Sequence, residues 1–465
     1  MTDTYDLVTI GSGPAGESAA ELAAFFGHRA AVIEKARPGG TVTTTGGAPT
    51  KTLREAALYF SGFREGDVYG LRMAVPPEIA TDLIRKRTWS VCEQLQKLAA
   101  ENIASNGVDY IQGTARFNQD RTLAITGGDG RERTVHAKTI LIATGSRPSR
   151  PKNISFDIEG VCDTDTILFR GRPPKNILIA GGGAVGVEFA TICHALGVEV
   201  TIAERGNRLV TMMDGEISDR LSALFKEWGV SVLFGCTADG VSATNAGLEI
   251  MLSNGEKRMT DTLLFAAGRV ANTDNLGLEA IGIALDPRGR IVVDKHLRTN
   301  AEGIYAAGDV LGPTLASIAM EQGRVAVCHA FGISFEGTID PTPVSAVYGM
   351  PEISGAGLTE EQCREKGLDY QVGRSDLSLT PRGAIAGRGG LLKLIFLKNN
   401  RKLIGVHCIG DIASEIVGIG QMAIRCGGTA NTIANISMNT PTYSYAYKYA
   451  TFDALRRGMA EQKAA

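Results

Sequence analysis

The chain has 465 residues, a length that predicts two to four domains. Its 48 basic and 50 acidic side chains give a formal net charge of −2. The chain therefore has no excess of positive charge with which to bind a nucleic acid or an anionic membrane surface. No two of the eight cysteines lie within ten residues of each other, which excludes a local zinc knuckle or redox dithiol and predicts reduced, mostly buried thiols and no metal site.

The first predicted element is a short buried strand from Asp6 to Ile10. A loop of the form GxGxxG follows from Gly11 to Gly16, then an alanine-rich helix to about Phe26 and a second strand from Ala30 that ends at Glu34. This order is typical of a dinucleotide-binding βαβ unit. Because the unit begins so close to the first residue, and because no uncharged apolar run reaches the roughly 18 residues of a membrane span, we expect a soluble, cytoplasmic protein.

The same pattern returns 170 residues later. A predicted strand from Asn176 to Ala180 leads into the loop Gly181 to Gly186, a helix to about Leu196, and a strand from Val198 that is followed by Glu204. A single GxGxxG is a weak signal, but two copies in full context predict two dinucleotide sites. We therefore predict an α/β fold with two Rossmann-like domains.

The glycines of each loop let the backbone approach a pyrophosphate at a helix N-terminus, where unpaired amides and the helix dipole favour an anion. Glu34 and Glu204 are expected to accept hydrogen bonds from a ribose diol. An acidic residue at position 204 favours NAD(H), because it repels a 2′-phosphate. Arg205 and Arg208 follow directly and leave NADP(H) open.

Two further strands end in small-residue turns, Ala143-Thr144-Gly145 and Ala266-Ala267-Gly268, each suited to a close approach to a nucleotide. Asp309 follows another strand and can hold a ribityl hydroxyl. The helix that opens near Ala316 can direct its positive end at developing negative charge on a flavin.

The remaining segments carry no fingerprint of their own. Residues 82–105 have apolar side chains at helical spacing and predict a long packing helix. Residues 336–465 mix predicted strands from Leu391 to Leu397 and from Lys402 to Ile409 with a helix from about Ser414 to Arg425. We interpret this region as a separate α+β domain.

The strings GSGPAGESAA, ATGSRP, GGGAVGVEFA, AAGRVANT, IYAAGDV and PEISGAGLTE resemble the class I pyridine nucleotide-disulfide oxidoreductases over nearly the full length. Similar members include dihydrolipoamide dehydrogenase and the soluble pyridine nucleotide transhydrogenase. The resemblance implies an FAD-binding domain over 1–150 and 276–335, an NAD(P)-binding domain over 151–275, and a dimerisation domain over 336–465. It also implies a homodimer in which the C-terminal domain completes the active site of the partner.

Site residues carry over from the same resemblance. It places FAD on the first glycine fingerprint and the nicotinamide nucleotide on the second. Ala184 stands where some relatives have a bulky ring, which implies an open nicotinamide face. The implied FAD contacts are Gly11, Gly13, Ala15, Gly16, Glu34, Lys35, Val42, Lys51, Ala143, Thr144, Gly145, Asp309 and Ala316. The implied nucleotide contacts are Gly181, Gly183, Ala184, Val185, Gly186, Glu204 and Gly268.

The chain departs from the family at the dithiol machinery. Val42 and Gly47 occupy the two cysteine positions, and Thr440 and Tyr445 occupy the positions of the acid–base histidine and its glutamate. These residues provide neither a thiolate nor a proton shuttle near neutral pH. Reduction of a disulfide by the family's usual route is therefore not expected.

The flavin side of the machinery is retained, since Lys51 matches the lysine near flavin N5 and Glu188 matches its ion-pair partner. We predict an FAD-dependent NAD(P)H oxidoreductase that passes hydride from the nicotinamide to flavin N5 and then directly to a non-disulfide acceptor. That acceptor is a second nicotinamide nucleotide, a quinone or another small molecule, and the predicted catalytic residues are Lys51, Glu188, Thr440 and Tyr445. The alternative is an FAD-bound structural or redox-sensing protein without turnover. Thr43, Thr44 and Thr45 either line a polar acceptor pocket or cap a helix.

Overall fold

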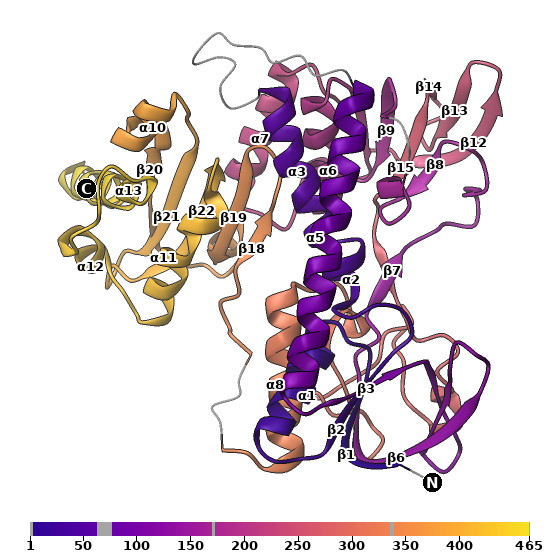
Figure 1. Cartoon of the computed structure of the whole chain (residues 1–465). Helices are drawn as coiled ribbons and strands as arrows, with labels where there is room; N and C mark the ends of the chain where they lie inside the picture. Colours follow the sequence, from indigo (N-terminus) through magenta and orange to yellow (C-terminus); the bar gives the residue numbers. More distant parts are fainter. Residues whose placement is uncertain (1–2, 63–76, 170–172, 335–338, 465) are drawn as a thin grey trace.

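The computed structural model describes residues 3–62, 77–169, 173–334 and 339–464. It shows two α/β units, each built on a parallel sheet, and a C-terminal unit built on an antiparallel sheet (Figure 1). The predicted fold class, two Rossmann-like domains and an α+β domain, is confirmed. The domain boundaries at 150, 275 and 335 stay predictions.

The first unit is a seven-stranded sheet of order β3-β2-β1-β6-β5-β4, with β17 also paired to β6. Strands β1, β2, β3, β6 and β17 are parallel, whereas β4 and β5 extend the sheet as an antiparallel hairpin. Its strands are β1 (Asp3–Ile10), β2 (Ala30–Glu34), β3 (Asp109–Gln112), β4 (Thr114–Phe117), β5 (Leu123–Thr126), β6 (Glu132–Ile142) and β17 (Ile304–Ala306). Because β17 pairs with β6, a segment far along the chain contributes a strand to the sheet of the N-terminal segment.

Helices α1 (Pro14–Phe25) and α8 (Ala316–Phe331) pack tightly against each other beside this sheet (Figure 1). A side chain at Gly323 of α8 would overlap the backbone oxygen of Ala15 in α1. The buried face of α1 is made of small residues, including Ala19 and Ala23, which let the helices approach closely. This contact brings the start of α8 near the first glycine loop.

The second unit is a five-stranded parallel sheet of order β11-β10-β9-β15-β8, beside an antiparallel meander of β12, β13 and β14. A two-stranded ribbon of β7 and β16 links the first and second units. The bounds are β7 (Ser146–Pro148), β8 (Val161–Asp163), β9 (Asn176–Ala180), β10 (Glu199–Glu204), β11 (Ser231–Phe234), β12 (Ala238–Thr244), β13 (Gly247–Leu252), β14 (Lys257–Thr260), β15 (Thr262–Phe265), β16 (Arg269–Ala271), α6 (Ala184–Ala195) and α7 (Gly215–Glu227).

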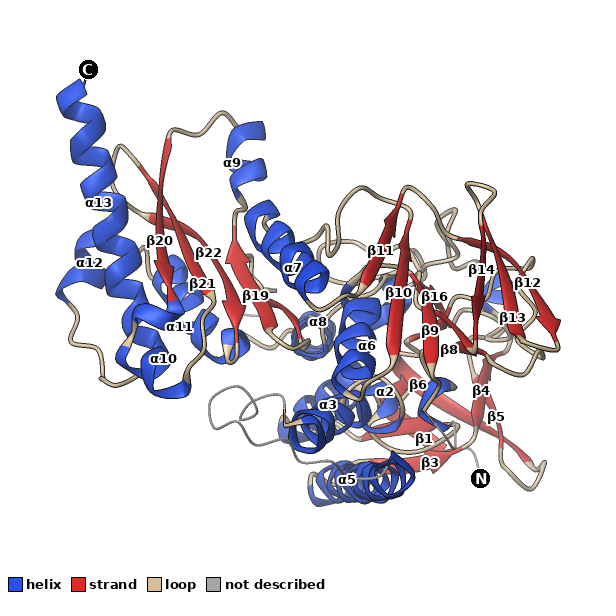
Figure 2. Cartoon of the chain, turned by 90° about the horizontal axis from the view of Figure 1, so that it is seen from above, coloured by secondary structure: helices blue, strands red, loops and turns tan. Residues whose placement is uncertain are grey.

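The C-terminal unit is an antiparallel sheet of order β18-β19-β22-β21-β20. Helices α11 and α13 pack on one face, and α7 of the second unit lies on the other (Figure 2). The bounds are β18 (Ser345–Val347), β19 (Glu352–Gly357), β20 (Tyr370–Asp376), β21 (Leu391–Leu397), β22 (Leu403–Gly410), α9 (Glu360–Glu365), α10 (Pro381–Ala386), α11 (Ala413–Arg425), α12 (Ala430–Asn435) and α13 (Ala446–Ala464).

A buried ion cluster joins the second and C-terminal units. Lys393 of β21 is only 1% exposed, and its Nζ lies 2.8 Å from Asp214, 3.0 Å from Glu216 and 2.6 Å from Glu360. Asp214 and Glu216 belong to the start of α7, whereas Lys393 and Glu360 belong to the C-terminal unit. Since a buried charge is costly unless it is paired, this cluster fixes how the two units sit.

Three helices lie between β2 and β3 along the chain: α2 (Gly40–Thr44), α3 (Ala48–Ser61) and α5 (Pro77–Ser105). Helix α3 contacts both α5 and α6, and α5 lies at the outer edge of the molecule, beside α3 and β3 (Figure 2). The predicted long helix over 82–105 is confirmed and begins five residues earlier. Short 3-10 helices cover Ile167–Phe169, Leu278–Ile281, Gly308–Leu311, Leu377–Leu379 and Tyr443–Tyr445. None of the described helices combines the length and the apolar character needed to cross a bilayer.

Helix α1 carries two acidic residues one turn apart, Glu17 and Glu21. Burial and the charge of Glu21 raise the pKa of Glu17 to about 7, against a smaller opposing effect of Asn102. Because the folded-state pKa lies above the unfolded-state value, this carboxyl destabilises the fold progressively as pH rises from about 4.5 to about 7. We expect Glu17→Gln to raise the unfolding temperature at pH 8 and the difference to vanish near pH 4. Thermal unfolding followed by circular dichroism at both pH values checks this, and equal melting at pH 8 would contradict it.

Candidate active site

The two glycine loops have the same local geometry. In the first, a side chain at Gly11 would overlap the backbone oxygen of Ala143, and one at Gly16 would overlap the backbone oxygen of Gly11. Gly11 also has φ +108°, a conformation that favours glycine. The first and third glycines of the fingerprint are therefore required by the packing of strand, turn and helix.

The second loop repeats these contacts. A Cβ on Gly181, where φ is +118°, would lie 2.7 Å from the backbone oxygen of Ala266, and one on Gly186 would overlap the backbone oxygen of Gly181. The turn Ala266-Ala267-Gly268 thus packs against the second loop in the same way that Ala143-Thr144-Gly145 packs against the first. A small-residue turn therefore lies against the glycine loop in both units, and the predicted approach of each turn to a nucleotide stays a prediction.

The middle glycine of each loop differs from the first and third, because none of its described contacts requires a glycine there. Apart from its chain neighbours and its own helix backbone, no atom of the described residues lies within 4 Å of a Cβ built on Gly13 or Gly183, and both have ordinary extended backbone angles. Each is the N-cap of its helix and makes no side-chain hydrogen bond to the first turn, where backbone amides have no acceptor within the helix. The space and the unpaired amides fit a pyrophosphate in contact with the backbone.

An acidic residue closes each site from the end of the second strand. Glu34 and Glu204 each accept two backbone amides, one from the second position of the glycine loop and one from two residues further along the chain. The bonds are Ser12 N to Glu34 Oε2 and Ala36 N to Glu34 Oε1 at 2.9 Å each, and Gly182 N to Glu204 Oε2 and Gly206 N to Glu204 Oε1 at 2.6 Å each. Both carboxylates are thus held at the mouth of the loop, where they can accept the hydroxyls of a ribose.

Asp309 lies where the first sheet meets the β7–β16 ribbon. Its carboxylate accepts the Ser146 hydroxyl at 2.7 Å and the Thr314 amide at 2.9 Å, and Arg269 Nε lies 3.9 Å away. Helix α8 begins at Ala316, which is exposed, so its positive end is accessible from the same side. This arrangement fits the predicted contact of Asp309 with a hydroxyl of the ribityl chain of FAD.

The remaining predicted contact residues differ in how far they are exposed. Ala15 is buried in the α1–α8 contact and Gly16 is buried against Gly11, whereas Lys35 and Val185 are exposed at the edges of their loops. Ala184 is half-buried as the first residue of α6. These positions surround the two glycine loops, and their predicted contacts with cofactor and nucleotide stay predictions.

Lys51 and Glu188 form an ion pair between α3 and α6. The distance from Lys51 Nζ to Glu188 Oε2 is 2.8 Å, with the Glu188 side chain only 8% exposed and that of Lys51 35%. The second oxygen of Glu188 is also engaged, because its Oε1 accepts a hydrogen bond from the backbone amide of Tyr348 at 2.9 Å. The Tyr348 ring lies under the ammonium, with Nζ 5.0 Å from the ring centre. Burial raises the pKa of Tyr348, and the carboxylates of Glu352 and Glu188 add to this.

The two positions that hold cysteines in dithiol relatives lie next to each other here. Val42 belongs to α2, and Gly47 is the N-cap of α3. A Cβ on Gly47 would lie 2.8 Å from Val42 Cα and 2.7 Å from its backbone oxygen. Real Cβ atoms do not approach a backbone so closely, and a disulfide separates the two Cβ atoms by about 3.5–4.5 Å. This loop therefore has no room for a disulfide at positions 42 and 47 unless its backbone moves.

The alternative that Thr43, Thr44 and Thr45 cap a helix N-terminus is wrong. Helices α2 and α3 have Gly39 and Gly47 as N-caps, and neither receives a side-chain cap. The hydroxyl of Thr43 instead donates to the backbone oxygen of Pro38 at 2.7 Å, and that of Thr44 to the backbone oxygen of Gly40 at 2.9 Å. In a short helix the preceding carbonyls lie within reach of these hydroxyls, and they compete with capping.

The structure adds two charged residues near this loop that sequence reasoning missed. Arg269 donates to the Ser146 hydroxyl at 2.8 Å and lies 3.8 Å from Asp165. Burial raises the pKa of Asp165, while Arg269 and a hydrogen bond from Thr45 oppose that rise. Arg269 directly follows the Ala-Ala-Gly turn, so its position in the sequence was a usable signal, whereas Asp165 gave none.

Thr440 and Tyr445 do not join the other predicted catalytic residues within one chain. They lie between α12 and α13 along the chain, and these helices are on the opposite side of the C-terminal sheet from α3, which carries Lys51 (Figures 1 and 2). Thr440 is exposed, and Tyr445 is half-buried against Tyr449, with ring centres 5.3 Å apart. Their predicted role therefore depends on a second subunit.

The eight cysteines are all free, and seven of them are buried, as predicted. Burial raises the pKa of Cys193 to about 12 and raises the pKa of Cys408 as well. Cys426 alone is exposed, at the end of α11. None of these thiols lies in the loop beside Lys51.

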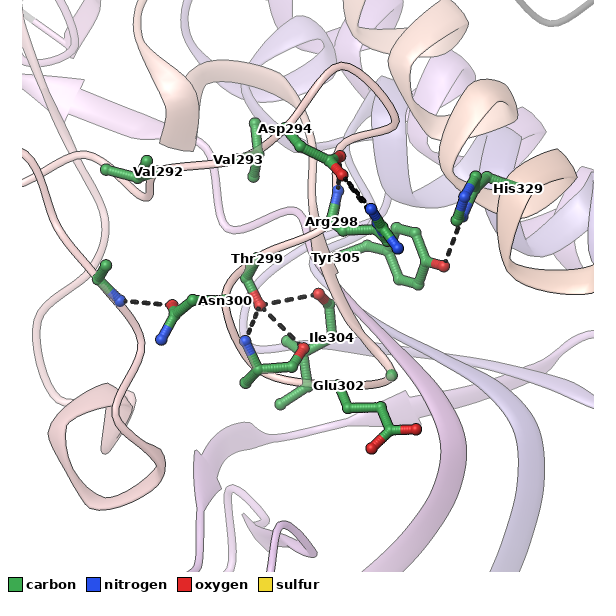
Figure 3. Close-up of a pocket in the computed structure, with 13 residues that line it drawn as sticks. Val292, Val293, Asp294, Arg298, Thr299, Asn300, Glu302, Ile304, Tyr305 and His329 are labelled. Carbon is green, nitrogen blue, oxygen red and sulfur yellow. Dashed lines mark hydrogen bonds and ion pairs between the residues drawn. The ribbon is translucent and has the colours of Figure 1, made fainter.

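A separate pocket of about 630 Å³ opens on the surface of the first unit (Figure 3). It is lined by Asp294, Arg298, Thr299, Tyr305 and His329 among others, and Asp294 and Arg298 pair with each other there. It contains none of the predicted site residues. The candidate active site is therefore the region around Lys51 and Glu188, between the two glycine loops.

Two family models match the chain. The first, described as Pyridine nucleotide-disulphide oxidoreductase, matches residues 5–323. The second, described as the Pyridine nucleotide-disulphide oxidoreductase dimerisation domain, matches residues 344–451. The first covers both glycine loops and the Lys51–Glu188 pair, and the second covers the antiparallel C-terminal unit.

Named relatives match over their whole length. The soluble pyridine nucleotide transhydrogenase of Mycobacterium tuberculosis is 37% identical over 457 residues, covering 97% of each chain. The enzyme of the same name from Hahella chejuensis is 38% identical over 459 residues, covering 97% of this chain and 98% of that one.

Solved structures show the same fold. LpdA from Mycobacterium tuberculosis superposes with a TM-score of 0.90 at 26% identity, covering 97% of this chain and 99% of that one. The HOCl-induced flavoprotein disulfide reductase RclA from Escherichia coli superposes with a TM-score of 0.86 at 28% identity, covering 96% and 99%. Flavoproteins therefore share both the units and their arrangement with this chain.

Proposed function

This chain belongs to the pyridine nucleotide-disulphide oxidoreductase family, and from that premise we propose that it oxidises NADH or NADPH and delivers the electrons directly to an acceptor that is not a disulfide. The family uses FAD and a nicotinamide nucleotide. The first glycine loop, Glu34 and Asp309 fit the FAD, and the second loop with Glu204 fits the nucleotide. Bound there, FAD would supply the hydride-transfer chemistry between the nicotinamide and a second acceptor.

The chain's own residues prepare the site for that transfer. The Lys51 ammonium supplies a fixed positive charge, and Glu188 aims it. The Tyr348 amide keeps Glu188 in place, so the pair does not need to reorganise as negative charge develops. A preorganised charge of this kind stabilises the transition state more than a solvated one.

One observation carries the proposal: the Lys51–Glu188 pair is intact, while position 47 has no space for a side chain beside Val42. The charge that assists nucleotide oxidation is kept. The loop that carries the dithiol in relatives has no room for a pair of cysteines here. Relatives named soluble pyridine nucleotide transhydrogenase favour a second nicotinamide nucleotide as the acceptor. A quinone or another small molecule is the other candidate.

We further propose a homodimer. The dimerisation-domain model matches the C-terminal unit, and several large apolar side chains of that unit are exposed in the single chain: Met422, Ile436, Phe452 and Met459. A second copy covering this surface would bring Thr440 and Tyr445 towards the partner's Lys51. Neither residue is a strong acid or base near neutral pH, so we assign them to lining the acceptor pocket.

The experiment is anaerobic reduction of the purified holoprotein by NADH and by NADPH, followed by re-oxidation with thio-NAD, a quinone, oxygen or lipoamide. We expect the flavin absorbance to bleach with at least one nucleotide and to return with thio-NAD but not with lipoamide. Bound flavin that neither nucleotide bleaches would instead support a redox-inactive structural protein. Rapid re-oxidation by lipoamide would show that the direct-transfer proposal is wrong.

A further inference from the structure

The loop after β10 folds back over the second glycine loop. Glu204 ends the strand, and six residues later the amide of Val210 donates to the backbone oxygen of Gly182 at 2.9 Å. Arg208 lies inside this loop, four residues beyond Glu204. The only cation nearer to Glu204 in the loop is Arg205, which is exposed. Arg208 is thus carried by the same loop that presents Glu204 to the ribose.

Arg208 is held by carboxylates of two different units. Its Nη1 lies 3.5 Å from Glu361 of α9, in the C-terminal unit, and its Nε lies 3.9 Å from Asp219 of α7. Glu361 also contacts the Gly215 amide at 3.4 Å, at the start of α7. Burial opposes ionisation of Glu361, but its hydrogen bonds outweigh that effect and lower its pKa, so it is a carboxylate at neutral pH.

Gly215 shows how closely this pair is built. A Cβ on Gly215 would overlap Glu361 Oε1 and would lie 2.6 Å from Arg208 Nη1. Any larger residue at 215 would push the two charges apart. Arg208 and Glu361 are each 35% exposed, so the pair is accessible to solvent and can exchange partners.

We propose that Glu361 sets the nucleotide preference of the second site by holding Arg208 away from the place of a 2′-phosphate. With Arg208 engaged, the charges left in the loop beside the ribose are the exposed Arg205 and Glu204. Glu204 accepts a 2′-hydroxyl and repels a 2′-phosphate, so NADH is preferred. When Arg208 leaves Glu361, it offers a charge-assisted contact to the 2′-phosphate, and NADPH is accepted. This inference rests on the proposed function, because it assigns NAD(P)H to the second loop.

The test compares wild type with Glu361→Gln, Arg208→Gln and the double variant, all as FAD-loaded protein. At position 361 glutamine keeps the size of the side chain and removes its charge, and at position 208 it removes the guanidinium but leaves a shorter polar side chain. Two quantities are measured: the ratio of kcat/KM for NADPH to that for NADH, and the ratio of affinities for adenosine 2′,5′-bisphosphate and ADP by calorimetry. We expect Glu361→Gln to raise both ratios about fivefold, the scale of one partly exposed ion pair, and the double variant to lose this gain.

Arg364→Gln is the matched control, because Arg364 lies 3.6 Å from the same Glu361 carboxylate and has no contact with Arg208 among those described. Its ratios should equal those of wild type. Unchanged ratios in Glu361→Gln, or an equal rise in the double variant, would overturn the proposal. If neither nucleotide reduces the flavin, the proposed function fails, whereas the ligand affinities still decide whether Glu361 and Arg208 control 2′-phosphate binding.

Discussion

Replacing Lys51 by methionine is expected to slow flavin reduction by NADH at least about a hundredfold while flavin stays bound. The Lys51 ammonium lies 2.8 Å from the buried carboxylate of Glu188, so it is a fixed charge in a partly dry site. Removing one preorganised group that stabilises developing charge typically costs a factor of about 10²–10³. Methionine keeps most of the length of the lysine stem, so the loss reports on charge. Anaerobic stopped-flow measurement of flavin bleaching gives the rate.

Lys97→Met is the matched control, because Lys97 is a highly exposed lysine on α5 whose charge is paired only loosely, with Glu101 at 3.6 Å. We expect it to reduce its flavin at the wild-type rate. Glu188→Gln should fall between the two, since it leaves the ammonium but frees it to move. A Lys51→Met protein that keeps its flavin and is reduced at the wild-type rate would show that Lys51 plays no part in the transfer.

The two glycine loops could be predicted from the sequence because their geometry is local. Within each loop, Gly16 and Gly186 are required by contacts with Gly11 and Gly181 only five residues earlier. A local steric requirement leaves a spacing that can be recognised without a structure. Strands β9 and β21 were likewise predicted to the residue, since their apolar runs are bounded by turns on both sides.

The Lys51–Glu188 pair was foreseen in another way. The two residues are 137 positions apart, and no local pattern links them. Their pairing was expected only because both positions match a family motif, and the contact between α3 and α6 then placed them at 2.8 Å. Tyr348 was missed because it acts through its backbone amide, which has no signature in the sequence.

Contacts between units were the least predictable part of the site. Glu361 reaches Arg208 from a helix 153 residues away, and Asp165 approaches Arg269 across the junction of the second unit and the ribbon. Such contacts depend on how complete units pack against each other. A sequence motif within one unit carries no information about that packing. The threonines of α2 show the same difficulty at short range, because carbonyl acceptors competed successfully with helix capping.

The largest structural effect is expected from a methyl group at Gly186, and its contrast with Gly183 tests the second site directly. In Gly186→Ala the new methyl would overlap the backbone oxygen of Gly181, so the turn must open. We expect a loss of about 3 kcal/mol or more in the stability of the second unit. Reduction by NADH should fall at least about a hundredfold, because the amides that hold the pyrophosphate move with the turn.

Gly183→Ala is the informative partner of this variant, because beyond its own helix and chain neighbours the new methyl meets no atom of the described residues within 4 Å. Its fold should lose less than about 1 kcal/mol, the cost of alanine at a helix N-cap. The KM for NADH should nevertheless rise about tenfold or more, because the methyl occupies the space that the backbone leaves for the pyrophosphate. Both variants should keep FAD, which the first loop binds. A Gly183→Ala protein with unchanged KM would mean that the nucleotide does not bind at this loop, whatever the stability of Gly186→Ala.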